Sequence, residues 1–373
     1  MMTSYYSSST NTRVMPLWAV VALCCGAAAC SGPALVPEGE QATIYSVFSQ
    51  SRGYVVGAPV TGSGLHVMNA DSSWTRLGWN HPITFSIGFD PFDSNIFYIA
   101  AGNGLMRSLD RGATWKITTD WRMTEVLDVA TDPGHEGDLY IGTAYGIWLS
   151  RDRGDTWKHV GPTATRPYIE AIVADRSRPG TLIAAGERGL FRSTDRGETW
   201  TTLLSDEEYV MEIKQDLYDD NRWWAGSHDR GLLTSTDGGV QWQRVGSLTN
   251  EKGVHAIALD ATQKGRIAIT GWDIGVQVSE DHGATWTDRT QGLPGCEAYT
   301  VITNPPVDPP PCLFETLFDP SQSGRLFAAT VESGLYVSDD AGANWRLHGN
   351  VGAIFQDMEV GPTAPTLPLE VNR

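Results

Sequence analysis

Tandem repetition is the feature that most constrains this chain. Six segments match the pattern Ser-x-Asp-x-Gly-x-x-Trp, here called the repeat motif: Ser108–Trp115, Ser150–Trp157, Ser193–Trp200, Ser235–Trp242, Ser279–Trp286 and Ser338–Trp345. A seventh, degraded copy ends at Trp74. Successive motif tryptophans lie 41 to 44 residues apart, apart from a last gap of 59. Repetition at this period indicates a fold assembled from equivalent structural units.

Each unit contains the same series of short apolar runs. One run ends in Asp or Asp-Pro, a second ends at small residues, a third follows a marker glycine, and a fourth begins at the motif tryptophan. Short runs rich in Val, Ile and aromatic residues, bounded by Gly, Pro and Asp, predict strands, and no stretch shows helical periodicity. Four strands per unit predict an all-β fold, a seven-bladed β-propeller of four-stranded antiparallel blades.

The two ends of the repeat array are expected to meet. Residues 351–360 have the form of a first strand without the other three, and the N-terminal unit has the other three near residues 54–78. A C-terminal strand that completes the first blade would therefore close the ring. Residues 42–48 are an alternative for that position, and either choice gives seven blades. We expect the propeller to span 42–362, with a tail at 363–373.

The long last gap predicts an insertion at residues 294–312. Its run of prolines between 305 and 311 cannot supply the hydrogen bonds of a sheet, so we expect a loop. Cys296 and Cys312 are the only cysteines outside the N-terminal leader. An even pair in an exported chain predicts one disulfide, with two unpaired thiols as the alternative.

The N-terminus has the features of an export signal. A polar start with one charge, Arg13, precedes an apolar run too short for an ordinary membrane span, so we expect a signal peptide at 1–29. The small residues before Cys30 resemble a bacterial lipobox, although Ala27 stands where that pattern prefers Leu. The resemblance implies lipidation of Cys30, a linker at 30–41 and a place in the bacterial cell envelope. A secreted protein with an ordinary cleaved signal and an uncleaved anchor are the alternatives.

Composition excludes several classes of function. The net charge of −17 argues against a nucleic-acid binder, which needs a basic surface. No His/Cys cluster has ligand spacing and no glycine-rich phosphate loop opens a helix, so we expect no metal site and no cofactor. Four carboxylates fall at equivalent places on the expected inner strands: Asp128, Glu212, Glu315 and Asp357. They would line an acidic channel, which we expect to be solvated, with a bound cation as the alternative.

The repeat motif resembles the Asp-box, also called the bacterial neuraminidase repeat, from about residue 42 to 360. That family includes sialidases, xyloglucan-cleaving glycosidases, the sortilin ectodomain and photosystem II assembly factors. The resemblance implies that the motif is structural and lies between strands three and four, away from the ligand face. Length and blade count look closest to the single-propeller, assembly-factor-like members. The Arg-Ile-Pro motif of sialidases is absent, and the xyloglucan enzymes build their cleft between two propellers.

The loops on the opposite face carry the candidate ligand-binding side chains: Trp121, Arg122, Tyr145, Tyr168, Arg188, Tyr209, His228 and Trp272. Aromatic residues with arginine are typical of protein-contact surfaces, whereas aromatic residues beside carboxylates also suit sugars. We expect a non-enzymatic propeller that binds a protein partner there, and a lectin or glycoside hydrolase is the alternative. Glycoside hydrolysis needs two carboxylates, for which the candidates are Asp229, Asp273 and Glu332; no catalytic residue is assigned.

Overall fold

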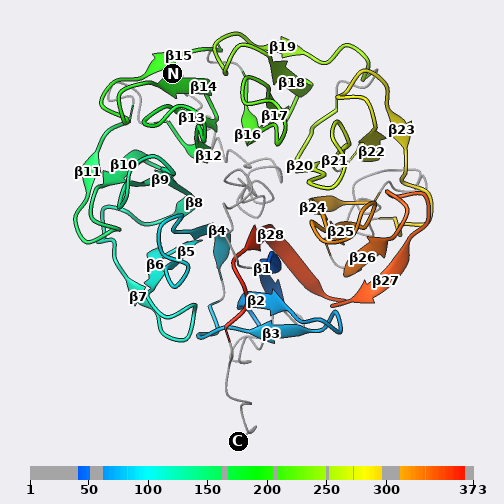
Figure 1. The fold of residues 1–373 in the computed structure, drawn as a ribbon, viewed down its shortest axis with the longest axis horizontal. Coiled ribbons are helices and arrows are strands. Elements are labelled where there is room, and N and C mark those ends of the chain that lie inside the picture. Colours follow the sequence, from blue (N-terminus) through cyan, green and yellow to red (C-terminus); the bar gives the residue numbers. More distant parts are fainter. Residues whose placement is uncertain are drawn as a thin grey trace, which may run out of the picture.

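The computed structural model describes residues 41–50, 62–81, 83–161, 167–204, 208–248, 252–271, 273–295, 311–331 and 333–365. In these ranges the chain forms strands and turns but no helix, and so contains no helix that could span a membrane. Seven four-stranded antiparallel sheets stand around a central axis as blades (Figure 1). The predicted seven-bladed β-propeller is confirmed. The predicted signal peptide with Cys30 lies outside the described residues, as do Cys296 and nearly all of the insertion.

In blades 2 to 7 the strands follow sequence order from the axis to the rim. Blades 2 to 4 comprise β4 (Thr84–Phe89), β5 (Phe97–Ala101), β6 (Gly104–Ser108) and β7 (Lys116–Ile117); β8 (Val126–Thr131), β9 (Leu139–Thr143), β10 (Gly146–Ser150) and β11 (Lys158–His159); and β12 (Ile169–Ala174), β13 (Leu182–Gly186), β14 (Gly189–Ser193) and β15 (Thr201–Thr202). Blades 5 to 7 comprise β16 (Val210–Gln215), β17 (Trp223–Ser227), β18 (Gly231–Ser235) and β19 (Gln243–Arg244); β20 (Ala256–Leu259), β21 (Ile267–Gly271), β22 (Gly275–Ser279) and β23 (Thr287–Asp288); and β24 (Leu313–Phe318), β25 (Leu326–Thr330), β26 (Leu335–Ser338) and β27 (Arg346–Gly349).

Blade 1 joins the two ends of the described chain. Its strands are, from the axis outward, β28 (Ala353–Gly361), β1 (Thr43–Gln50), β2 (Gly64–Met68) and β3 (Trp74–Arg76). The predicted closing strand at the C-terminus is confirmed, because β28 pairs antiparallel with β1. The assignment of residues 42–48 as a rival for the innermost position was wrong. This segment is the second strand, a position that the sequence reading had placed after residue 54.

The hydrophobic core is divided among the seven boundaries between blades. At the boundary of blades 1 and 2, for example, Tyr45 and Val47 pack with Ile87 and Phe97. Corresponding clusters lie at the other six boundaries, and each includes the motif tryptophan of one of its two blades. The tryptophans therefore join neighbouring blades by burying apolar area between them.

The repeat motif forms a hydrogen-bonded turn between strands three and four. In blade 2 the Ser108 hydroxyl donates to Asp110 Oδ1 (2.7 Å) and accepts from the Gly112 N–H (2.8 Å). Asp110 also accepts from the Thr114 N–H (2.8 Å), and Trp115 Nε1 donates to the Gly112 carbonyl (2.9 Å). The Ser108, Asp110 and Trp115 side chains thus all bond within the turn, which supports a structural role for the motif.

The marker glycine begins the third strand of its blade and needs a positive φ. This angle is +129° at Gly104 and +110° at Gly146, a region that other residues resist. A Cβ atom on Gly104 would lie 2.1 Å from Thr119 Oγ1. The repeated glycine therefore reflects both backbone conformation and close packing.

Candidate functional site

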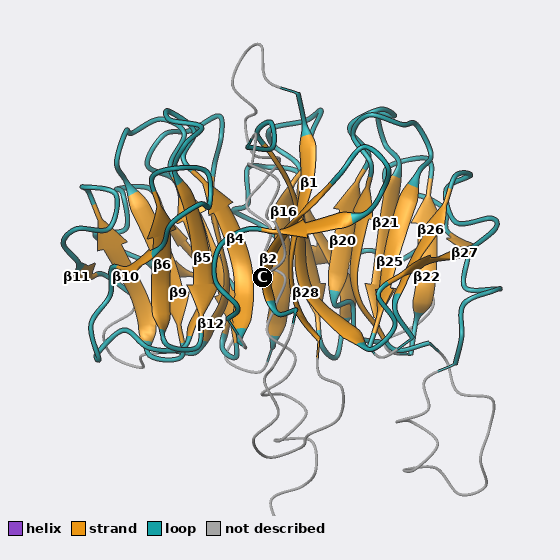
Figure 2. Ribbon diagram, turned by 90° about the horizontal axis from the view of Figure 1, so that it is seen from below, coloured by secondary structure: helices purple, strands orange, loops and turns teal. Residues whose placement is uncertain are grey.

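Alternation of the strands gives the propeller two different faces. The repeat-motif turns and the turns between strands one and two lie on one face, here called the motif face. The loops from strand two to three, and from strand four to the next blade, lie on the other, here called the loop face. The strands stand upright between these two faces in the side view of Figure 2.

Three of the five exposed aromatic side chains in the described part of the chain lie on the loop face. Trp79, Trp121 and Tyr145 are 56%, 83% and 50% exposed, and Ile83 beside them is 53% exposed. These four residues, here called the apolar arc, come from the loops of blades 1 to 3. Solvent exposure of several large apolar side chains on one face is typical of a contact surface.

Backbone hydrogen bonds connect the loops of the apolar arc. The Gly102 N–H donates to the Ile83 carbonyl (3.2 Å), and the Gly102 carbonyl accepts from the Glu125 N–H (3.0 Å). The Glu125 carbonyl in turn accepts from the N–H of Ala144, next to Tyr145 (3.2 Å). The loops that carry the arc are therefore held against one another in the folded protein.

A second group of side chains gathers on the loop face of blades 4 to 6, here called the polar cluster: Glu170, Glu208, Tyr209, His228, Arg230 and His255. The Tyr209 hydroxyl donates to Glu170 Oε2 at 2.6 Å, and its ring stacks on His228 with centroids 6.0 Å apart. His228 faces His255 at 6.4 Å and bonds Asp229 Oδ1 through Nδ1 at 2.8 Å. Three neighbouring rings thus form a row, and the first of them, Tyr209, is hydrogen-bonded to a buried carboxylate.

The acids and bases of the polar cluster differ in burial. Glu170 and Glu208 are buried, whereas His228 and Arg230 are exposed. Glu208 Oε2 lies 3.5 Å from Arg230 Nη1, a long contact that leaves the arginine free to meet another group. Burial, with a smaller effect of His228, lowers the pKa of His255 to about 3, so this imidazole is neutral at physiological pH. The cluster offers hydrogen-bonding groups and flat rings to a ligand.

The predicted ligand-face residues divide between these two groups. Trp121 and Tyr145 belong to the apolar arc, and Tyr209 and His228 belong to the polar cluster. Tyr168 is half-buried between blades 3 and 4. The remaining described candidates are arginines with acidic neighbours. Arg122 is exposed and contacts Asp120 (2.6 Å), and Arg188 is half-buried near Glu187 (3.7 Å). Trp272 lies outside the described residues.

The candidate catalytic carboxylates do not form a described pair. The Asp229 side chain is 74% exposed and Asp273 is exposed, whereas Glu332 lies outside the described residues. A general acid in glycoside hydrolysis is kept protonated by its surroundings, and neither described aspartate is buried. Of the polar cluster, Glu170 lies in β12 at its loop-face end. Sequence reasoning missed Ile83, whose apolar side chain before a strand is typical of a core residue.

The predicted acidic channel is buried rather than solvated. Asp128, Glu212, Glu315 and Asp357 are at most 1% exposed, so the preference for solvated side chains was wrong. Their positions on the inner strands are equivalent, and the surrounding side chains and backbone cover them. The cation alternative is not favoured either, because in the described chain no three of these carboxylates bring ligand atoms within 4.8 Å of one another.

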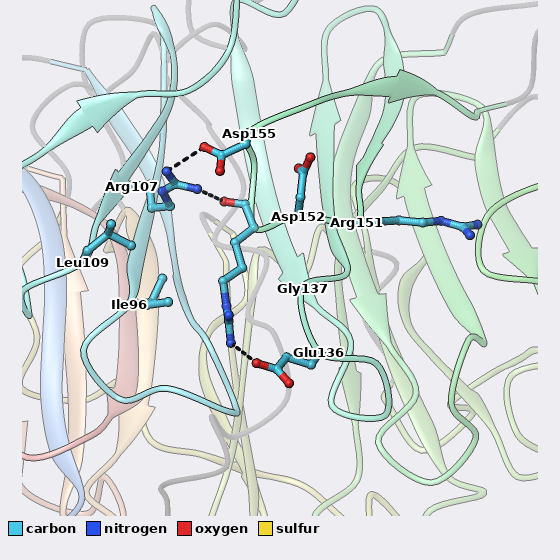
Figure 3. A pocket seen from close by; sticks show the side chains of 9 residues that line it. Ile96, Arg107, Leu109, Glu136, Gly137, Arg151, Asp152 and Asp155 are labelled. Carbon is cyan, nitrogen blue, oxygen red and sulfur yellow. Dashed lines mark hydrogen bonds and ion pairs between the residues drawn. The ribbon is translucent and has the colours of Figure 1, made fainter.

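A pocket of about 460 Å³ lies on the motif face at the boundary of blades 2 and 3 (Figure 3). Arg107 crosses this boundary and donates to the Arg153 carbonyl (2.6 Å) and to Asp155 Oδ1 (2.8 Å). Arg153 in turn reaches Asp90 and Glu136, both at 2.8 Å. Since these charged groups satisfy one another, we assign the pocket's polar lining to bracing the two blades.

One group of three potential metal ligands occurs in the described part of the chain, at a motif-face turn of blade 3. Its members are Asp132, His135 and Asp138. Asp132 accepts from His135 Nδ1 (2.9 Å) and from the Gly180 N–H of the next blade (3.0 Å), and Asp138 accepts from Arg196 (2.8 Å). These bonds occupy the carboxylates and give the group a structural role.

No protein-family model matches the chain, and no curated protein matches it in sequence. Among solved structures, it is similar to the GH74 xyloglucanase of Xanthomonas campestris, with a TM-score of 0.64 and 18% identity, and to the GH74 enzyme of Niastella koreensis, with 0.63 and 17%. Each alignment covers 87% of this chain and 55% of the other. This chain therefore spans about half the length of those enzymes.

YCF48 from Cyanidioschyzon merolae is also similar, with a TM-score of 0.54 and 14% identity over 76% of this chain and 96% of that one. YCF48 bound to D1 peptide matches with a TM-score of 0.53 and 14% identity, over 76% and 94%. At these identities the likeness shows a shared propeller fold.

Proposed function

We propose that this chain is a non-enzymatic Asp-box propeller that binds a protein partner on its loop face. The observation that carries the proposal is the apolar arc, whose large side chains are exposed on linked loops of neighbouring blades. Aromatic side chains dominate the energy of protein contacts when a partner removes them from water. The likeness to YCF48, whose structure was solved with a bound peptide, also supports this proposal.

Site-specific photocrosslinking in cells tests the proposed partner binding. A photoreactive amino acid at Trp121 is compared with one at Leu109, a matched control that is 59% exposed on the motif face. We expect a discrete crosslinked protein from position 121 and none from 109. The double variant Trp121→Ala/Tyr145→Ala should lose the partner while keeping its thermal stability. Equal crosslinking from the two faces would refute the proposal.

The second candidate function is carbohydrate binding or glycoside hydrolysis on the same face. The flat rings of Trp121 and Tyr145 favour it, since exposed aromatic rings can stack on sugars. A glycan array and fluorogenic glycosides, applied to the purified protein, separate the two functions. Turnover that disappears in Asp273→Asn or Glu332→Gln would establish the enzyme in place of the protein-binding role.

We also propose that the chain is exported and anchored through a lipid on Cys30. The apolar segment ending in three alanines before this cysteine supports the proposal. Metabolic labelling with a fatty-acid analogue should mark the wild-type protein and not Cys30→Ser. The Cys296–Cys312 disulfide stays a prediction, which peptide mapping without reductant would check.

A further inference from the structure

Six ionisable side chains meet around the propeller axis on the inner strands, away from the loop-face clusters. Five are carboxylates, here called the channel carboxylates: Asp128, Glu212, Glu315, Asp357 and Glu359. The sixth is Lys214, which is also buried. All five carboxylates are at most 3% exposed. The closing strand β28 supplies two of them, Asp357 and Glu359.

Lys214 links blade 5 to blade 1 across the axis. Its Nζ lies 3.5 Å from Glu212 Oε1 and 3.7 Å from Glu359 Oε1, which is long for a charge-assisted hydrogen bond. Both Glu212 oxygens, Glu315 Oε2 and Glu359 Oε1 are buried without a hydrogen-bond partner of normal geometry in the described chain. One ammonium cannot neutralise five buried carboxylates, and an unpaired buried carboxylate takes up a proton instead.

The strands packed against β28 and the neighbouring inner strands offer no further compensating charge. β4, β20 and β25 contain no ionisable residue, and the tyrosine of β1, Tyr45, donates its hydroxyl proton to the Pro362 carbonyl. Glu170 of β12 is engaged with Tyr209 on the loop face. Lys214 is therefore the only cation on the inner strands beside these acids.

Two channel carboxylates also join neighbouring blades. Asp357 Oδ2 accepts the Ile87 N–H of blade 2 at 2.8 Å, and Asp128 Oδ2 accepts the Ile172 N–H of blade 4 at 2.6 Å. Both N–H groups follow a β-bulge, where the ladder is interrupted. Because these carboxylates bond the backbone of neighbouring blades, their protonation affects the packing of the inner strands against one another.

Burial shifts all five groups in the same direction. It raises the pKa of Asp128 to about 8 and that of Glu359 to about 7. Burial, followed by repulsion from neighbouring carboxylates, raises the pKa of Glu212, Glu315 and Asp357 well above the ordinary range. A cavity of about 70 Å³, lined in part by Lys214 and Glu359, gives small molecules such as water access to this end of the channel.

We propose that closure of the ring is proton-coupled. The channel carboxylates take up protons when β28 packs into blade 1, so protonation stabilises the closed ring and alkaline pH destabilises it. A folded-state pKa above the unfolded value means that stability is lost as pH rises through the folded value. The window is therefore near neutral to mildly alkaline pH. Burial lowers the pKa of His66 to about 4 and that of His255 to about 3. These histidines therefore make stability fall as the pH drops, but only below about pH 6.5, outside the window of the channel carboxylates.

Hydrogen–deuterium exchange of the full chain tests the proposal at about pH 6.5 and about pH 9, with protection factors corrected for intrinsic rates. We expect protection of β28 and β1 to fall about tenfold or more at the higher pH, while β13 and β14 in blade 4 change much less. Equal protection at both pH values, or a uniform loss over all blades, would overturn the proposal.

Isosteric variants connect the effect to the channel. Glu359→Gln and Glu212→Gln, on opposite sides of the axis, should each reduce the pH dependence of β28 protection. Glu136→Gln, which removes one exposed charge on the motif face, should leave it unchanged. Full pH dependence in both channel variants would refute the role of these carboxylates.

Discussion

The serine of the repeat motif offers a direct measure of what holds a blade turn together. Ser193 is 1% exposed, and its Oγ accepts from the Gly197 N–H (2.9 Å) and donates to Asp195 (2.8 Å). Ser193→Ala leaves the buried Gly197 N–H without an acceptor. An unsatisfied buried donor costs about 1–3 kcal/mol. We therefore expect the free energy of unfolding to fall by that amount.

The matched control is the exposed hydroxyl of the same turn. Thr199 Oγ1 donates to Asp195 Oδ2 at 2.6 Å, but Thr199 is exposed and water can replace this bond. We expect Thr199→Val to cost less than about 1 kcal/mol. Urea unfolding measures both variants, with a shift in midpoint at constant slope reporting a change in stability.

The same experiment can be repeated in other blades of one molecule. The corresponding N–H to Oγ distances lie between 2.7 and 3.0 Å in the turns of Ser108, Ser150, Ser235, Ser279 and Ser338. We expect similar costs, which should add within about 0.5 kcal/mol for distant blades. If Ser193→Ala costs no more than Thr199→Val, tryptophan packing rather than the buried serine holds the turn.

Three further outcomes follow from burial and close packing. A Cβ on Gly186 would lie 1.8 Å from a backbone oxygen of the neighbouring loop, so Gly186→Ala should lower the free energy of unfolding by about 2 kcal/mol or more in thermal unfolding. The control Gly246→Ala, whose Cβ would have no atom within 4 Å, should be neutral. Because His66 and His255 have lowered folded-state pKa values, they should make stability fall as pH drops below about 6.5, and His255→Gln should reduce that slope in urea titrations. Phe355→Ala, at a fully buried site in the closing strand, should cost about 3–5 kcal/mol in urea unfolding. A cost below about 1 kcal/mol would contradict the role of β28 in holding the ring closed.

Much of the fold could be predicted because its determinants are local. The motif serine and aspartate form hydrogen bonds within four residues of themselves, and the marker glycine is required by the positive φ at its own position. Repeating these signals at one period specifies blade number and strand positions. The loop assignments of Tyr145 and His228 followed directly, since a residue between strands two and three can lie on only one face.

Tertiary structure decided the features that depend on how distant segments meet. Segments 43–50 and 353–361 are both apolar and strand-like, so only pairing in the closed ring could order them in blade 1. Lys214 and Glu359 lie far apart in sequence, and only closure brings them within 3.7 Å and away from water. A local pattern can specify a strand or a turn, but burial of charge depends on the whole ring, because desolvation is set by every blade that faces the axis.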